Sequence, residues 1–159
     1  MTSTSRPPDG PSGRSGRILA IDPGEKRIGV AAADLRTGVA VPLTTLDAGT
    51  DAVEVVGRLV EEEGAQELVV GVAVSLSGAL GPQGQRGREL AEALARRLDV
   101  PVHTWDERLT SVEARHRAAM PAGRQAPRGR RKRKGDLDAA AAAIILQAYL
   151  DSRRRAEHG

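Results

Sequence analysis

Residues 17–46 decide the fold, because RILAIDPGEKRIGVAAADLRTGVAVPLTTL contains three apolar runs separated by short turns. The runs cover residues 17–22, 28–34 and 39–46, and the connecting PGEKR and LRTG are typical turn sequences. Connections this short join antiparallel strands, since a parallel pair needs a crossover of a dozen or more residues. The stretch therefore predicts an antiparallel β-meander.

The rest of the chain alternates helical and strand patterns. Asp51 and Glu54 open a helical pattern that ends at Gly64, and ELVVGV at 67–72 is typical of a buried strand. The other predicted elements are a helix over 83–98, a strand over 100–105, a helix that Thr110 or Ser111 could cap, and a last helix from about 137 to 154. This order predicts an α/β fold, in which helices flank a mixed five-stranded sheet of meander and crossover-connected parallel strands.

Two segments stand apart from the predicted core. Residues 1–16 are rich in Ser, Pro, Gly and Arg and are expected to form a disordered tail. The single predicted domain covers 17–155, and within it PAGRQAPRGRRKRK at 121–134 indicates a flexible basic loop. From Arg115 to Lys134 there are nine Lys or Arg and no acid, which favours an anionic partner; a solvated charge run is the alternative.

The composition excludes several classes of protein. The chain has no Phe, one Trp and one Tyr, so we expect nucleic acid to be held by its backbone rather than by broad base stacking. The absence of Cys excludes disulfides, cysteine nucleophiles and zinc–thiolate sites. The N-terminal segment lacks the apolar core of a signal peptide, and no run approaches the roughly 20 apolar residues of a membrane span. We therefore expect a cytoplasmic protein with no membrane partner.

Three carboxylates lie at the ends of predicted elements. Asp22 ends the first strand, Glu107 follows the strand at 100–105, and Asp138 lies in the first turn of the last helix. Hydrolysis of a phosphodiester needs an activated water and relief of negative charge, which two Mg²⁺ or Mn²⁺ ions held by carboxylates supply. The joint placement of the three acids favours one catalytic and metal-binding site.

Each acid also has a simpler explanation. Asp22 could be a solvent-facing turn residue, and Glu107 could be an exposed acid or an ion-pair partner of Arg108. Asp138 could cap its helix, a role it would share with Asp136. Because side chains alternate along a strand, only one of Asp106 and Glu107 is expected to face the site.

Basic residues near the acids are candidates for holding phosphate. Lys26, Arg27 and Arg108 are neighbours of the proposed ligands in the sequence. The basic loop adds a dense group of candidate nucleic-acid-binding residues: Arg130, Arg131, Lys132, Arg133 and Lys134. The Gly-rich VSLSGALGPQG matches neither nucleotide-binding glycine pattern, and His103 and His116 are assigned no role.

Four blocks of the sequence resemble the motifs of a known family. IDPGEKRIGVAAAD, VVGVAVSLSGALGPQ, VHTWDERLTSVEA and KGDLDAAAAAIILQAYLD are similar, in order and spacing, to the motifs of the YqgF family, also called RuvX, over about residues 17–152. The resemblance implies an RNase H-like fold related to RuvC junction resolvases, and maturation of the 5′ end of 16S rRNA in the bacterial cytoplasm. It carries the three catalytic acids onto Asp22, Glu107 and Asp138.

The sequence departs from the family pattern at one place. Family members usually read GLPL, an acidic residue and Gly, whereas this chain has Gly71-Val72-Ala73-Val74 followed by Ser77-Gly78. The Pro and the acid are therefore missing from the loop expected on the substrate side.

Three functions are compatible with the sequence. The first is a Mg²⁺- or Mn²⁺-dependent nuclease on structured RNA, the 16S rRNA precursor, with Asp22 bridging two metals that Glu107 and Asp138 complete. The second keeps the chemistry and cleaves branched DNA as a symmetric homodimer, so monomer and homodimer both stay open. The third is a ribosome-assembly factor that binds nucleic acid without cleaving it.

Overall fold

The computed structural model describes residues 16–49, 51–111 and 134–158. Most of the predicted tail at 1–16 and of the basic loop at 121–134 lies outside the described residues. Only residues 16 and 134 of these segments are described. The described elements, in chain order, are β1 (Arg17–Pro23), β2 (Arg27–Asp34), β3 (Ala40–Asp47), α1 (Ala52–Glu62), β4 (Ala65–Val72), α2 (Pro82–Arg97), β5 (Val102–Asp106) and α4 (Lys134–His158).

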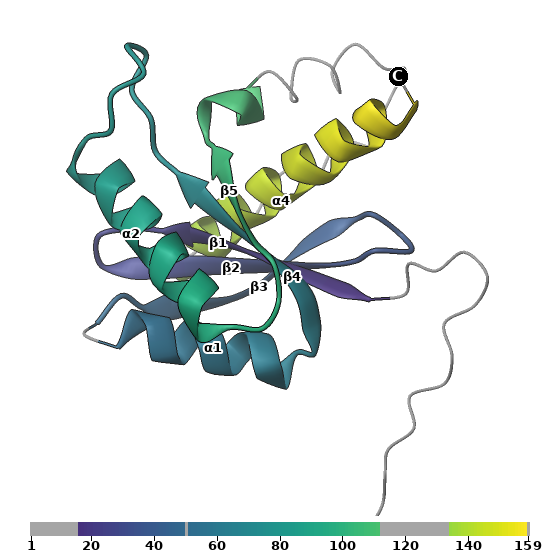
Figure 1. Ribbon diagram of the computed structural model, residues 1–159, viewed down its shortest axis with the longest axis horizontal. Coiled ribbons are helices and arrows are strands. Elements are labelled where there is room, and N and C mark those ends of the chain that lie inside the picture. The colour runs from purple at the N-terminus through teal and green to yellow at the C-terminus, as the bar shows by residue number, and fades with distance from the viewer. Residues whose placement is uncertain (1–15, 50, 112–133, 159) are drawn as a thin grey trace, which may run out of the picture.

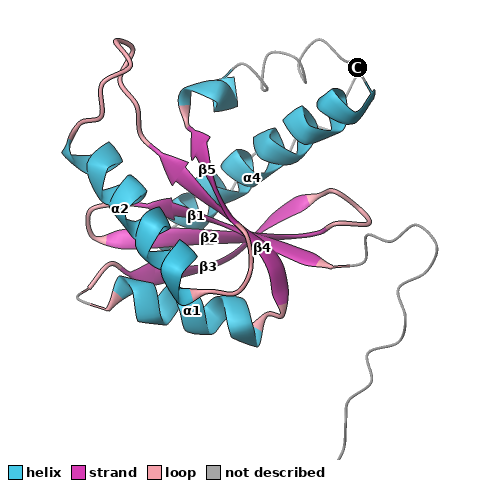
Figure 2. Ribbon diagram, viewed as in Figure 1, coloured by secondary structure: helices cyan, strands magenta, loops and turns pink. Residues whose placement is uncertain are grey.

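The strands form one mixed sheet in the order β3-β2-β1-β4-β5 (Figures 1 and 2). β1 pairs antiparallel with β2, and β2 pairs antiparallel with β3, as the short turns predict. β4 lies parallel to β1 and β5 lies parallel to β4. The carboxyl ends of β1, β4 and β5 therefore meet at one edge of the sheet, and the predicted mixed five-stranded sheet is confirmed.

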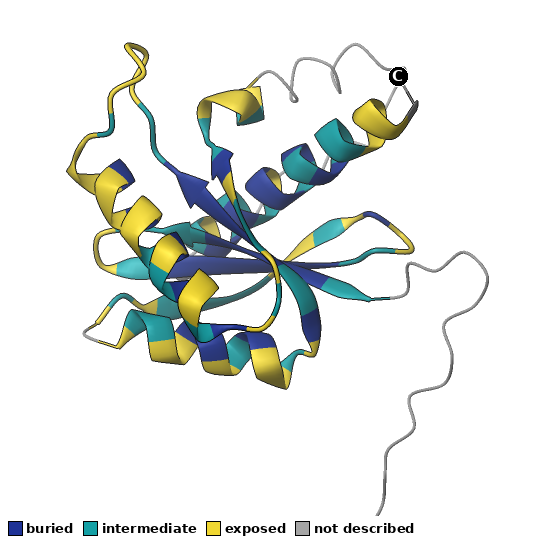
Figure 3. Ribbon diagram, in the orientation of Figure 1, coloured by how far each residue is buried: buried dark blue, intermediate teal, exposed yellow. Residues whose placement is uncertain are grey.

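Helices cover both faces of the sheet and bury two separate apolar clusters (Figure 3). Alternate residues of β1 divide between them: Leu19 and Ile21 pack under α1 and α2, whereas Ile18 and Ala20 pack under α4. The α4 cluster is built largely from small Ala side chains, including Ala31 on the sheet. Small residues on both surfaces let the helix lie close to the strands.

Some element boundaries differ from the sequence-based expectation. β5 begins at Val102 rather than residue 100, because Pro101 has no N–H and its carbonyl accepts a bond from the Leu68 N–H (3.0 Å). The helix after β5 begins at residue 108, so neither Thr110 nor Ser111 caps it. The carboxylate of Asp106 instead accepts the backbone N–H of Arg108 at 2.9 Å.

The last helix also differs in length. It runs from Lys134 to His158, which is longer at both ends than the expected 137–154. Asp138 consequently lies in the second turn, where stabilisation of a carboxylate by the helix dipole has weakened. None of the helices in the described ranges is long and apolar enough to cross a membrane.

Candidate active site

Asp22 lies at the carboxyl end of β1 on the face that α4 covers. It follows Ile18 and Ala20 in the strand alternation, and both of those residues are buried under α4. In the antiparallel ladder Asp22 pairs with Gly29 of β2. Directly paired residues project to the same face of the sheet. Because Gly29 has no side chain, it leaves room beside the Asp22 side chain.

Gly29 brings Asp138 to this place. A Cβ atom at position 29 would collide with the backbone carbonyl of Asp138, so α4 lies against the bare backbone of β2. The Asp138 carboxylate is held by Arg27, with 3.3 Å between Arg27 Nε and Asp138 Oδ2. The second turn of α4 is thereby fixed next to the end of β1.

Glu107 reaches the same face from the end of β5. Its backbone N–H donates to the Val72 carbonyl (3.0 Å), which continues the parallel β4–β5 ladder by one residue. Its Oε1 atom lies 3.4 Å from the position that a Cβ of Gly71 would take, and its carboxyl group hydrogen-bonds with Asp22. Two acids that are 85 residues apart in sequence therefore meet at one sheet edge.

The environment of Glu107 favours its protonated form. Burial, the hydrogen bond with Asp22 and the negative charges of Asp22 and Asp106 all raise its pKa, to about 8. All of these causes act in the same direction. A cation bound beside Glu107 would therefore compete with the proton of this carboxyl group.

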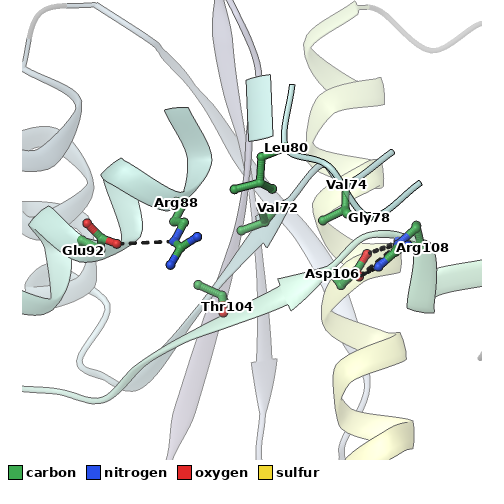
Figure 4. A pocket seen from close by; sticks show the side chains of 9 residues that line it. All are labelled: Val72, Val74, Gly78, Leu80, Arg88, Glu92, Thr104, Asp106 and Arg108. Carbon is green, nitrogen blue, oxygen red and sulfur yellow. Dashed lines mark hydrogen bonds and ion pairs between the residues drawn. The ribbon is translucent and has the colours of Figure 1, made fainter. Parts of the chain in front are cut away.

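Asp106 has the opposite environment although it is the neighbour of Glu107. Its carboxylate accepts a hydrogen bond from the Arg108 guanidinium, with 2.6 Å between Arg108 Nη2 and Asp106 Oδ2. This hydrogen bond lowers the pKa of Asp106. Asp106 lines a pocket of about 460 Å³ between β4, β5 and α2, together with Val72, Val74, Gly78, Leu80, Arg88, Glu92, Thr104 and Arg108 (Figure 4). The side chains of Asp106 and Glu107 thus serve different faces, as strand alternation predicts.

The candidate phosphate-binding residues are placed differently from one another. Arg27 pairs with Asp138 at the carboxylate site, and exposed Lys26 is its neighbour at the turn before β2. The Arg108 guanidinium is engaged with Asp106 and donates to the Ser75 carbonyl (3.3 Å). Residues 130–133 and the side chain of Lys134 lie outside the described residues, so phosphate contact by this group stays a prediction.

Known proteins with the same sequence features identify the family. Residues 16–152 match the family model described as RuvX, Holliday junction resolvase. The chain belongs to the RuvX family. A relative from Chloroflexus aurantiacus, named as a pre-16S rRNA nuclease, is 43% identical over 143 residues, which cover 86% of this chain and 88% of the relative. A relative of the same name from Thermobifida fusca is 43% identical over 145 residues, covering 89% and 91%.

A solved structure shows the same fold. Thermus thermophilus RuvC in complex with a Holliday junction substrate superposes with a TM-score of 0.55 at 16% identity, covering 87% of this chain and 96% of RuvC. The expected RNase H-like fold is therefore confirmed, together with the family.

The RuvX chain offers oxygen ligands of the kind that hard divalent cations bind. Asp22 and Glu107 fit such a cation in donor chemistry, because a positive charge would stabilise the ionised form of Glu107 that burial and the neighbouring negative charges disfavour. Among residues 16–49, 51–111 and 134–158, however, no three His, Cys, Asp or Glu side chains gather closely enough to hold a metal ion. The carboxylate of Asp138 is turned to Arg27 instead.

Sequence reasoning missed the glycines that assemble this RuvX site. Gly29 admits α4, and Gly71 leaves room beside Glu107. An isolated Gly inside a strand often marks a close backbone approach, and this signal was present in both strand sequences. The pattern does not say which distant segment approaches.

Proposed function

We propose that this chain, a nuclease of the RuvX family, hydrolyses phosphodiester bonds of the 16S rRNA precursor with Asp22, Glu107 and Asp138 as its catalytic carboxylates. The observation that carries the proposal is the meeting of Asp22 and Glu107 at one sheet edge, where burial, the hydrogen bond with Asp22 and nearby negative charge raise the pKa of Glu107 to about 8. Perturbed acids from separate elements are typical of functional sites. The family resemblance supports the proposal that this activity takes place in the bacterial cytoplasm.

The carboxylates would hold Mg²⁺ or Mn²⁺. When bound, such ions supply an activated water and neutralise charge on the phosphate. Asp22 and Glu107 would provide the preassembled part of the ligand set, and Glu107 would have to lose its proton to act as a ligand. Asp138 would complete the set once its carboxylate is released from Arg27.

Arg27 links substrate binding to this change. Its guanidinium contacts Asp138 at 3.3 Å, and both side chains are partly exposed. A substrate phosphate offers the guanidinium a stronger, bidentate partner. Transfer of Arg27 from Asp138 to the phosphate would free the third carboxylate when substrate is present.

The proposed substrate is structured RNA. With one Trp and one Tyr in the whole chain, recognition relies on backbone charge and geometry, and contacts to the 2′-hydroxyl distinguish RNA from DNA. Lys26, Arg27 and Arg108, with the basic residues 130–134, are the proposed phosphate contacts. The names of the Chloroflexus and Thermobifida relatives support this substrate.

Cleavage of branched DNA is the second candidate, and the description of the matching family as Holliday junction resolvase favours it. The deciding experiment incubates purified protein with labelled 16S precursor RNA and with a synthetic four-way DNA junction, each with Mg²⁺, Mn²⁺ or EDTA at equal ionic strength. We expect metal-dependent cleavage of the RNA near its mature 5′ end to be faster. Faster symmetric incision of the junction by a dimer would select the resolvase, and binding without cleavage of either would select an assembly factor.

A further inference from the structure

A tight turn projects from the sheet edge where the acids lie. It occupies residues 75–78, after the carboxyl end of β4, and appears at the tip of the teal loop in Figure 1. The Gly78 N–H donates to the Ser75 carbonyl (2.9 Å), and the Ser75 N–H donates to the Ala79 carbonyl (3.0 Å). Gly78 has φ +87°, a conformation that favours glycine. The hydrogen bonds and the glycine fix the shape of the turn.

Leu76 stands at the second position of this turn with 96% of its surface exposed. The next most exposed large apolar side chains of the described ranges, Val39 and Ile144, are each 57% exposed. Nothing in the turn requires leucine, because its hydrogen bonds involve only backbone atoms and the Ser75 and Ser77 hydroxyls. A single exposed apolar side chain is common on protein surfaces, so what distinguishes Leu76 is the fixed turn that presents it.

The turn is tied to the candidate active site. Arg108 donates to the Ser75 carbonyl (3.3 Å), and Asp106 holds the same guanidinium. Glu107 lies between Asp106 and Arg108 in the sequence and donates its N–H to Val72, just before the loop begins. The position of Leu76 is therefore fixed by the segment that carries a proposed catalytic acid.

The two aromatic residues cannot take over a stacking role at this edge. Trp105 is only 7% exposed under α4. Tyr149 is packed edge-on against Trp105 and stacked on His103. An unstacked base would have to be held by an aliphatic side chain, and leucine is among the residues that proteins insert between bases.

We propose that Leu76 is an apolar wedge, inserted between bases of the nucleic acid next to the bond that is cut. The inference rests on the proposed nuclease function. The wedge opens a base step at the carboxyl edge of the sheet while Asp22 and Glu107 face the backbone. The pocket beside the turn, to which Val74 and Gly78 contribute, offers apolar walls next to the opened step (Figure 4).

The test measures base unstacking separately from cleavage. An RNA duplex with a single-stranded 5′ extension carries 2-aminopurine at the last base pair, and its fluorescence rises when that base unstacks. In the Asp22→Asn background, which leaves the RNA uncut, binding should raise the fluorescence. Leu76→Ala should remove most of that rise, and in the otherwise wild-type chain it should slow cleavage about tenfold, because unstacking a base step is costly.

Matched variants make the result specific. Leu76→Met keeps an apolar wedge and should retain both signals, whereas Leu76→Ser should lose them. Val41→Ala, at an exposed position on the opposite edge strand β3, should change neither. Leu76→Ala should not affect folding, since the side chain is 96% exposed.

Each outcome has one meaning. If RNA is cut but Leu76→Ala leaves fluorescence and rate unchanged, the wedge is refuted and the nuclease stands. If Leu76→Ala impairs only association with ribosomal particles and not naked RNA, the turn contacts protein and the wedge is again refuted. If the wild-type chain neither binds nor cuts RNA, the proposed function itself fails.

Discussion

Asp106 and Glu107 are consecutive acids at the end of β5, but the fold places them in opposite environments. Asp106 faces the α2 side, is bound by Arg108 at 2.6 Å and has a lowered pKa. Glu107 faces α4 and is hydrogen-bonded to Asp22. Burial and this neighbour raise its pKa to about 8. One side of the sheet edge therefore satisfies its negative charge with arginine, and the other concentrates negative charge. A cation-binding site requires concentrated negative charge, as on the side of Glu107.

The largest expected loss of cleavage comes from changing an acid on the α4 face of the sheet. Asp22→Asn should reduce cleavage at least about a thousandfold, because loss of a charged ligand removes several kcal/mol of transition-state stabilisation. Folding and RNA binding should be preserved, since the side-chain volume is unchanged. Single-turnover cleavage of labelled precursor RNA at saturating Mg²⁺ measures the effect. Wild-type turnover by Asp22→Asn would show that the proposed site is wrong.

Asp106→Asn provides the control for that variant on the other face. It should reduce cleavage far less than Asp22→Asn, because Asp106 contacts Arg108 rather than the proposed ligands. Glu107→Gln and Asp138→Asn should resemble Asp22→Asn. A loss in Asp106→Asn as large as in Asp22→Asn would contradict the division between the two faces.

The next effect concerns the placement of α4. Gly29→Ala should lower cleavage about a hundredfold and destabilise the protein by about 1–3 kcal/mol, because its Cβ collides with the Asp138 carbonyl and pushes the helix away. Thermal melting and cleavage assays measure the two effects. Gly49→Ala is the matched control, since a Cβ at position 49 meets no atom within 4 Å. Equal activity of the two variants would exclude this role for Gly29.

A pH titration of stability distinguishes the two acids by sign. The folded chain binds the Glu107 proton more tightly than the unfolded chain, so this group costs stability as pH rises from the ordinary glutamate pKa of about 4.5 to the raised pKa of about 8. Without divalent metal, Glu107→Gln should therefore melt at a higher temperature than wild type at pH 9, and the difference should shrink at pH 5. Thermal melts in EDTA measure it.

Asp106 should give the opposite sign in the same melts. Its lowered pKa means that its ion pair stabilises the protein above pH 3.8 and is lost on acidification. Asp106→Asn should accordingly melt below wild type at pH 7. The same direction of change for both variants would overturn the contrast between the faces.

The smallest effect concerns the basic segment. Neutralising the six basic residues of 128–134 should weaken binding of any polyanion and reduce the slope of log K against log salt, by about 0.7–0.9 per lost phosphate contact. Sequence preference should hardly change. A slope equal to that of wild type would assign the segment to solvated linker.

Local patterns were enough to predict most of the fold. Period-two alternation and short turns predicted the meander at 17–46, and helical spacing predicted α1 and α2, because these signals arise from neighbouring residues. The same reasoning placed Asp22 and Glu107 at strand ends. It failed at the start of the helix after β5. There the Arg108 N–H donates to the Asp106 carboxylate, and neither of the expected cap residues is used.

By itself, the sequence determined the elements, the family and the acids available for catalysis. Only the tertiary structure decided which acid of β5 faces α4, that Asp138 pairs with Arg27, and that Arg108 is bound to Asp106 and Ser75. The physical reason is the distance along the chain over which each kind of interaction acts. Strand and helix periodicity records which side of an element is apolar, whereas a side chain's partner depends on segments that approach from far along the chain, as α4 approaches Gly29.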